Sequence, residues 1–123
     1  MFQIKVEYDF DAAHALRGYG GKCERLHGHR FRVVVAVDAQ GLDELGLAYD
    51  FVELKKHLRE VAEGFDHISL NDIPAFDKIN PSSENIALTI CRGLEPLLAR
   101  DPVSIAFVEV WESPESCARF TPS

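Results

Sequence analysis

The chain has 123 residues, of which 46% are hydrophobic and 27% charged, so we expect one globular domain spanning residues 1–123. The formal net charge of −7 argues against a broad surface for nucleic acid or for anionic membranes. No apolar run approaches the roughly 20 residues of a membrane span. No signal-like block opens the chain and the three cysteines lack framework spacing, so we expect a soluble cytoplasmic protein.

Two stretches near the N-terminus have the alternating polarity of β-strands. Residues 2–14 alternate apolar and polar side chains, which is typical of a strand with one wet face. Residues 26–38 repeat the pattern, with His27, His29 and Phe31 on one parity. The glycine-rich residues 16–24 between them indicate a loop. An antiparallel pairing of the two strands is the simplest topology.

Two amphipathic helices are predicted next. The first begins after the capping residue Asp50 and ends near Gly64. The second opens at Ser82 or Ser83, and it is expected to kink or end at the residue before Pro96.

Further strands are predicted at residues 103–111 and 117–120. The order of elements predicts an α+β fold: a four-stranded antiparallel sheet with two helices packed on one face. Such a sheet has two open edges, which proteins rarely leave uncovered, so oligomerisation is expected.

The triplet His27-Gly28-His29 is the strongest chemical signal in the chain. Residues at i and i+2 of a strand point to one face, about 7 Å apart at ~3.3 Å per residue, so two imidazoles there can converge on one metal ion. His14 has the matching parity at the end of the paired strand and is a candidate third ligand. Three histidines with an open fourth position would form a catalytic zinc site. A satisfied core or surface histidine is the alternative at each position.

Cys23 lies just upstream and admits three interpretations. It is a fourth ligand that closes a structural site, a reactive thiol beside the metal, or an inert, half-buried cysteine. Spacing alone does not separate these.

A cluster of positive charge surrounds the same stretch. Residues 17–32 contain five Lys or Arg and one Glu, a net +4 (5 − 1). The cluster suits a small polyanion such as a phosphorylated metabolite, and the alternative is a solvated strand face with chance clustering.

The chain resembles the 6-pyruvoyltetrahydropterin synthase family, closest to its 6-carboxytetrahydropterin synthase branch of queuosine biosynthesis. The resemblance rests on an ordered set of motifs: F-x-A-A-H at 10–14, C-x-x-x-H-G-H at 23–29, F-D-H-x-x-L-N-D at 65–72, P-S-S-E at 81–84 and V-x-V-W-E at 108–112. It implies the tunnelling fold, in which sheets of several subunits join into a barrel and two trimers stack into a homohexamer with active sites at subunit interfaces.

The resemblance also implies roles for particular residues. His14, His27 and His29 would hold Zn²⁺, and Cys23 would be an acid/base thiol. Other matching positions are Asp66 and His67 for a proton relay from a neighbouring subunit, Glu112 as the pterin anchor, and Ser82 and Ser83 near the pterin. Without the resemblance, Asp66 and His67 fit a helix-end cap and a surface histidine, and Glu112 fits a carboxylate paired with Arg119.

The implied activity is that of a zinc-dependent carbon–carbon lyase acting on a small-molecule pterin triphosphate. It would convert 7,8-dihydroneopterin triphosphate to 6-carboxytetrahydropterin, acetaldehyde and triphosphate. The alternatives are a 6-pyruvoyltetrahydropterin synthase, which stops before carbon–carbon cleavage, a structural zinc protein, and a pterin-binding homologue without catalysis. A further branch uses glutamate in place of the cysteine, and Glu24 lies beside Cys23.

Overall fold

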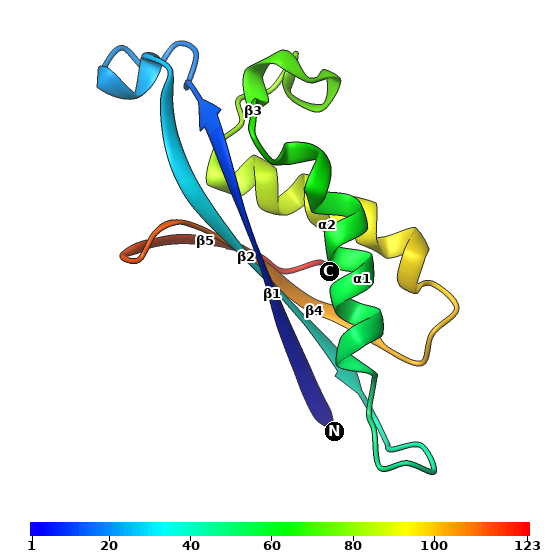
Figure 1. Ribbon diagram of the computed structural model, residues 1–123. Helices are drawn as coiled ribbons and strands as arrows, with labels where there is room; N and C mark the ends of the chain where they lie inside the picture. The colour runs from blue at the N-terminus through cyan, green and yellow to red at the C-terminus, as the bar shows by residue number, and fades with distance from the viewer.

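The centre of the sheet consists of two long strands, β1 (Phe2–His14) and β2 (His27–Ala39). In the computed structural model, which describes residues 1–123, they pair antiparallel along their whole length, with His14 opposite His27 (Figure 1). The antiparallel pairing predicted from the alternating polarity is therefore confirmed.

The sheet has five strands in the order β3-β1-β2-β4-β5. β4 (Ser104–Ser113) pairs antiparallel with β2, and β5 (Ser116–Phe120) pairs antiparallel with β4. These four antiparallel strands match the predicted sheet and confirm the α+β class. The short strand β3 (Ile68–Ser69) is a correction to the predicted sheet, because it adds a parallel pairing to β1 that no sequence pattern indicated. Two residues are too few to produce a periodic pattern.

Both helices, α1 (Phe51–Ala62) and α2 (Ser83–Leu98), cover the same face of the sheet (Figure 1). The Asp50 carboxylate caps α1 by accepting from the backbone N–H of Val52 at 2.8 Å. The hydroxyl of Ser82 caps α2 by accepting from the backbone N–H of Asn85 at 3.1 Å. None of the helices combines the length and apolar character that a membrane crossing needs.

Of the two alternatives predicted at Pro96, a kink or an end of the helix, the end is wrong, because α2 continues to Leu98. Proline lacks the N–H that would bond to the carbonyl four residues earlier, but Pro96 lies in the last turn, where only one such bond is lost. The buried side chains of Leu94 and Leu98 anchor this turn to the core.

The core lies between the helices and one face of the sheet. It contains alternate residues of β1 and β2, among them Phe10 and Phe31, together with Val108 and Val110 of β4. The same alternation continues to the end of the sheet, where His14, His27, His29 and Glu112 take the positions of core residues. The fold thus brings four potential ligands to one end of the apolar layer.

The contact between α1 and α2 depends on Gly93. A Cβ atom at this position would lie 2.8 Å from Cγ1 of Val61, closer than atoms pack. Gly93→Ala is therefore expected to destabilise the protein by up to about 2 kcal/mol, because overpacking costs about 1–3 kcal/mol and the better helix propensity of alanine offsets about 1 kcal/mol.

Urea unfolding measures this difference, with Gly64→Ala as the control because a Cβ at Gly64 meets nothing within 4 Å. Adding Val61→Ala to the Gly93 variant should remove part of the clash. A Gly93 variant as stable as the parent protein would show that the two helices are not packed as described.

Candidate active site

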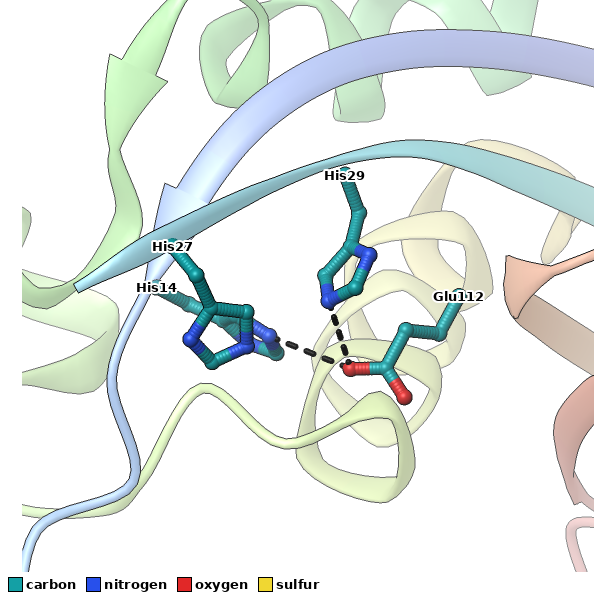
Figure 2. A group of neighbouring side chains, drawn as sticks. All are labelled: His14, His27, His29 and Glu112. Carbon is teal, nitrogen blue, oxygen red and sulfur yellow. Dashed lines mark ion pairs between the residues drawn. The ribbon is translucent and has the colours of Figure 1, made fainter. Parts of the chain in front are cut away.

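The three predicted histidines meet at one point at the end of the sheet. Ring centroids are separated by 4.6 Å for His14 and His27, 4.9 Å for His27 and His29, and 5.3 Å for His14 and His29. Glu112 of β4 joins them, with its Oε1 at 3.2 Å from Nε2 of His14 and 3.1 Å from Nε2 of His29 (Figure 2). One ligand atom from each of the four side chains lies within 4.8 Å of the others.

Two backbone carbonyls fix the tautomers of the imidazoles. Nδ1 of His14 lies 2.7 Å from the carbonyl oxygen of Pro81, and Nδ1 of His27 lies 2.7 Å from that of Arg25. A carbonyl oxygen only accepts, so each Nδ1 carries the hydrogen and each Nε2 of the neutral ring has a free lone pair. This is the outer-shell arrangement that orients metal-binding histidines.

The contact between His14 and Glu112 shows that the group suits a cation. Nε2 of His14 is buried and has no hydrogen-bond donor, although Oε1 of Glu112 lies 3.2 Å away. With the hydrogen on Nδ1, both atoms are acceptors, and two acceptors so close repel unless a proton or a metal ion lies between them. Three imidazoles and a carboxylate are a donor set suited to zinc. The residues therefore fit a divalent metal ion.

Burial lowers the pKa of His29 below the ordinary 6.5, and the nearby His14 and His27 lower it further, against the attraction of Glu112. His29 thus stays neutral, as a metal ligand must, to a lower pH than a free imidazole does.

This shift predicts how the metal-free protein responds to acid. Below pH 6.5 His29 becomes protonated in the unfolded chain, whereas in the folded chain it stays neutral until the pH reaches its lower pKa. The unfolded state therefore binds more protons between these two pKa values. The free energy of unfolding should therefore fall as the pH drops below 6.5, and His29→Gln should weaken this dependence. Urea unfolding in the presence of a chelator, from about pH 5 to 7.5, measures the difference. A stability gap between parent and variant that stays constant over this range would contradict the prediction.

Cys23 is not part of the histidine group. It lies on a short 3-10 helix, Lys22–Glu24, in the loop that connects β1 to β2, and its side chain is half-buried. Its carbonyl oxygen accepts from the N–H of Leu16 at 2.8 Å, so the thiol segment is tied beside the end of β1, two residues beyond His14. We call residues 15–24 the thiol loop.

Asp66 and His67 form a second group, at the edge of the sheet where β3 pairs with β1. Oδ1 of Asp66 accepts from the backbone N–H of Asp11 at 2.9 Å and lies 2.9 Å from Nδ1 of His67. The Asp11 hydrogen bond is the main cause that lowers the pKa of Asp66, so this carboxylate stays charged and orients the imidazole. His67 adopts a positive φ of 59°, and its exposed ring opens into a cleft of about 590 Å³ that Gly28 and Arg30 also line. His29 of the histidine group also lines this cleft.

The remaining predicted site residues are Ser82, Ser83 and Glu112. The Ser82 hydroxyl already accepts the capping hydrogen bond, whereas Ser83 is half-buried at the start of α2 and makes no side-chain hydrogen bond. Glu112 does not pair with Arg119, because Arg119 binds Glu109 at 2.6 Å. Glu112 shares the parity of Val108 and Val110 and faces inward. The resemblance implied only that it anchors the pterin, and not that it lies beside the imidazoles.

Most of the predicted basic cluster is already paired within the chain. Arg30 binds Asp11 at 3.1 Å and Arg32 approaches Asp9 at 3.5 Å, both on the face that the helices leave uncovered. Arg17 donates to backbone carbonyls. Only Lys22 and Arg25 of the cluster have neither an ion pair nor a side-chain hydrogen bond, and both line a surface hollow at the end of the thiol loop.

Fold and site together define an α+β protein with a histidine–carboxylate group, able to bind a metal ion, at the end of an antiparallel sheet. The chain belongs to the 6-pyruvoyl tetrahydropterin synthase family, whose profile matches residues 3–123. The family membership suggested by the sequence motifs is thus confirmed.

Similar proteins cover nearly the whole chain. A 6-carboxy-5,6,7,8-tetrahydropterin synthase from Synechocystis is 41% identical, over 98% of this chain and 93% of the relative. A dihydroneopterin monophosphate aldolase from Pyrococcus furiosus is 39% identical, over 92% and 91% of the two chains. The structure of Caenorhabditis elegans 6-pyruvoyl tetrahydropterin synthase superposes with a TM-score of 0.88 at 26% identity, covering 99% and 96% of the chains. The tunnelling fold expected for the subunit is therefore confirmed.

Proposed function

We propose that the protein is a zinc-dependent 6-carboxy-5,6,7,8-tetrahydropterin synthase of queuosine biosynthesis. It would convert 7,8-dihydroneopterin triphosphate to 6-carboxytetrahydropterin, acetaldehyde and triphosphate. The observation that carries the proposal is the convergence of three imidazoles beside a carboxylate, with the Nε2 lone pairs of His14 and His27 left free by their Nδ1 hydrogen bonds. The similarity to the Synechocystis enzyme supports the choice of product.

His14, His27 and His29 would hold the zinc ion, which when bound supplies a Lewis acid for the side-chain oxygens of the substrate. Glu112 would accept the 2-amino and N3–H edge of the pterin, because a carboxylate matches two parallel donors. Its side chain is 34% exposed and its second oxygen makes no contact in the chain, so it is within reach of a ligand. Of the two serines, Ser83 is the better candidate for a further contact to the pterin, because Ser82 caps α2.

Cys23 would transfer protons as a general acid and base on one side of the substrate. The oriented imidazole of His67, held by Asp66, would do so on the other side. In one subunit the Asp66–His67 pair forms a group separate from the histidine group, so it would serve the site of a neighbouring copy. The open edges support this assembly, because β3 covers only two residues of β1 and β5 pairs on one side only. We propose a homohexamer of two stacked trimers.

A mixing experiment tests the shared site. Cys23→Ala and His67→Ala should each be inactive alone, but co-assembled subunits should regain up to about a quarter of the parent activity, since random mixing leaves about a quarter of the interfaces with both wild-type residues. If both residues served the site of their own subunit, no mixed site would be complete. Mixed oligomers that stay inactive would therefore contradict a site built from two copies.

The identity of the product decides among the related activities. Incubation with 7,8-dihydroneopterin triphosphate, with and without a chelator, should give acetaldehyde and 6-carboxytetrahydropterin only when metal is present. A pyruvoyl product without carbon–carbon cleavage would overturn the proposal in favour of a 6-pyruvoyltetrahydropterin synthase. Substrate binding without any product would indicate a non-catalytic homologue.

The similarity to the Pyrococcus furiosus aldolase makes a monophosphate substrate the second candidate. Glu24 is the acid that such an activity would use in this chain, but its Oε1 accepts from the N–H of Gly18 at 3.1 Å. Parallel assays with dihydroneopterin monophosphate and with Glu24→Gln separate the two activities. Turnover of the monophosphate that depends on Glu24 and not on Cys23 would favour the aldolase.

A further inference from the structure

Two asparagine side chains clamp the backbone of the thiol loop. Asn71 accepts from the N–H of Ala15 at 2.8 Å and donates to the carbonyl of the same residue at 2.9 Å. Asn80 forms the same pair of bonds with Arg17, at 2.9 Å and 3.0 Å. Each amide thus takes the place of a neighbouring strand, and together they continue the pairing of β1 beyond its last residue.

The Arg17 side chain ties the loop to the same segment a second time. Its guanidinium donates to the backbone carbonyls of Phe76 at 2.7 Å, and of Asn71 and Ile79 at 3.2 Å each. These bonds use the two terminal nitrogens of the guanidinium, which would otherwise be the natural donors to a phosphate. Arg17 therefore acts on the protein and not on a substrate anion.

The segment that holds the thiol loop also holds a histidine of the metal group. Residues 71–81 end at Pro81, whose carbonyl oxygen fixes the ring of His14, and the carbonyl of Asn80 accepts from Nδ2 of Asn85 at 2.8 Å. One segment therefore hydrogen-bonds both to the imidazole and to the backbone of the loop that carries Cys23. The loop itself is closed by the bond from Leu16 to the Cys23 carbonyl.

We propose that Arg17 and Asn80 are positioning residues that place the Cys23 thiol relative to the metal group. The inference rests on the proposed function, because it gives Cys23 a role in proton transfer. Neither residue touches the substrate. Their role is to keep the thiol loop at a fixed distance from the imidazoles, which is the kind of placement that catalytic groups require.

Arg17→Ala and Asn80→Ala test the proposal in the zinc-loaded enzyme. We expect kcat to fall by about 100-fold in both, the loss associated with a misplacement of about 1 Å, with KM nearly unchanged. Zinc content should stay that of the parent. The amides of residues 15–24 should exchange hydrogen faster, while those of α1 and α2 keep their rates. Arg17→Lys retains a cation and should recover part of kcat. This variant keeps the proposal testable if Arg17→Ala does not fold.

Arg100→Ala is the matched control, because Arg100 is exposed and its side chain makes no hydrogen bond or ion pair. A rise in KM with kcat preserved, in Arg17→Ala alone, would make Arg17 a phosphate ligand and overturn the proposal. Unchanged kinetics in both variants, or loss of zinc from both, would overturn it as well. Cys23→Ala is assayed alongside. If Cys23→Ala turns over substrate like the parent protein, the proposed function fails. If Cys23→Ala is impaired and the Arg17 and Asn80 variants are not, only the positioning role fails.

Discussion

Replacing His29 with alanine should remove bound zinc and, with it, all turnover. His29 contributes one of three imidazoles that surround a single point, and its Nε2 lies 3.1 Å from the Glu112 carboxylate. Even outer-shell partners of metal ligands are worth about 10–100-fold in affinity, so the loss of a direct ligand should lower zinc affinity by at least about 100-fold. Metal analysis after dialysis and a competition titration with a chromophoric chelator measure this loss.

His57→Gln is the control for His29→Ala, because His57 lies on α1, near Glu53 and Glu60 and outside the group. It should keep full zinc content and activity. His29 also suits the test better than His14, since His14 is 1% exposed and its loss could unfold the protein. Full zinc content in the His29 variant would mean that the metal, if the protein binds one, lies elsewhere.

Replacing Cys23 with alanine should lower turnover but leave the zinc ion bound. The thiol is not within the group of ligand atoms, so zinc content should stay near one per subunit. Turnover should fall by about 10²–10⁴-fold, the usual contribution of a general acid or base. Zinc analysis and single-turnover kinetics on the same preparation show both effects.

Cys117→Ala is the matched control, since Cys117 is exposed on β5 and is not a member of the histidine group. It should change neither quantity. If Cys23→Ala lost its metal and its folded structure together, Cys23 would be a structural ligand and the protein would not be the proposed enzyme. Unchanged turnover would leave the thiol with no chemical role.

Strand alternation made the central part of the site predictable. The strands that carry His14, His27 and His29 continue the alternation of their core residues, so the three side chains had to share a face once the strands were paired. The same rule placed Glu112 facing inward. The two helices were predictable for a similar reason, because each has a long apolar stripe and a capping residue.

The parts that could not be predicted depend on loops. The carbonyls of Arg25 and Pro81 that fix the imidazoles lie outside regular elements, so no periodic pattern reveals them. The three carbonyls that bind Arg17 come from an irregular segment, and the basic cluster therefore looked like a site for an anion. The place of Asp66 and His67 at the edge of the sheet is set by the short strand β3 and by the positive φ of His67, neither of which has a sequence signature here.

X-ray absorption spectroscopy at the zinc edge tests the central claim most directly. The zinc-loaded protein should show three imidazole nitrogens and at least one oxygen at about 2.0–2.1 Å, and no sulfur neighbour. A sulfur scatterer at about 2.3 Å, or fewer than three imidazoles, would contradict a three-histidine centre with a position left for substrate oxygen.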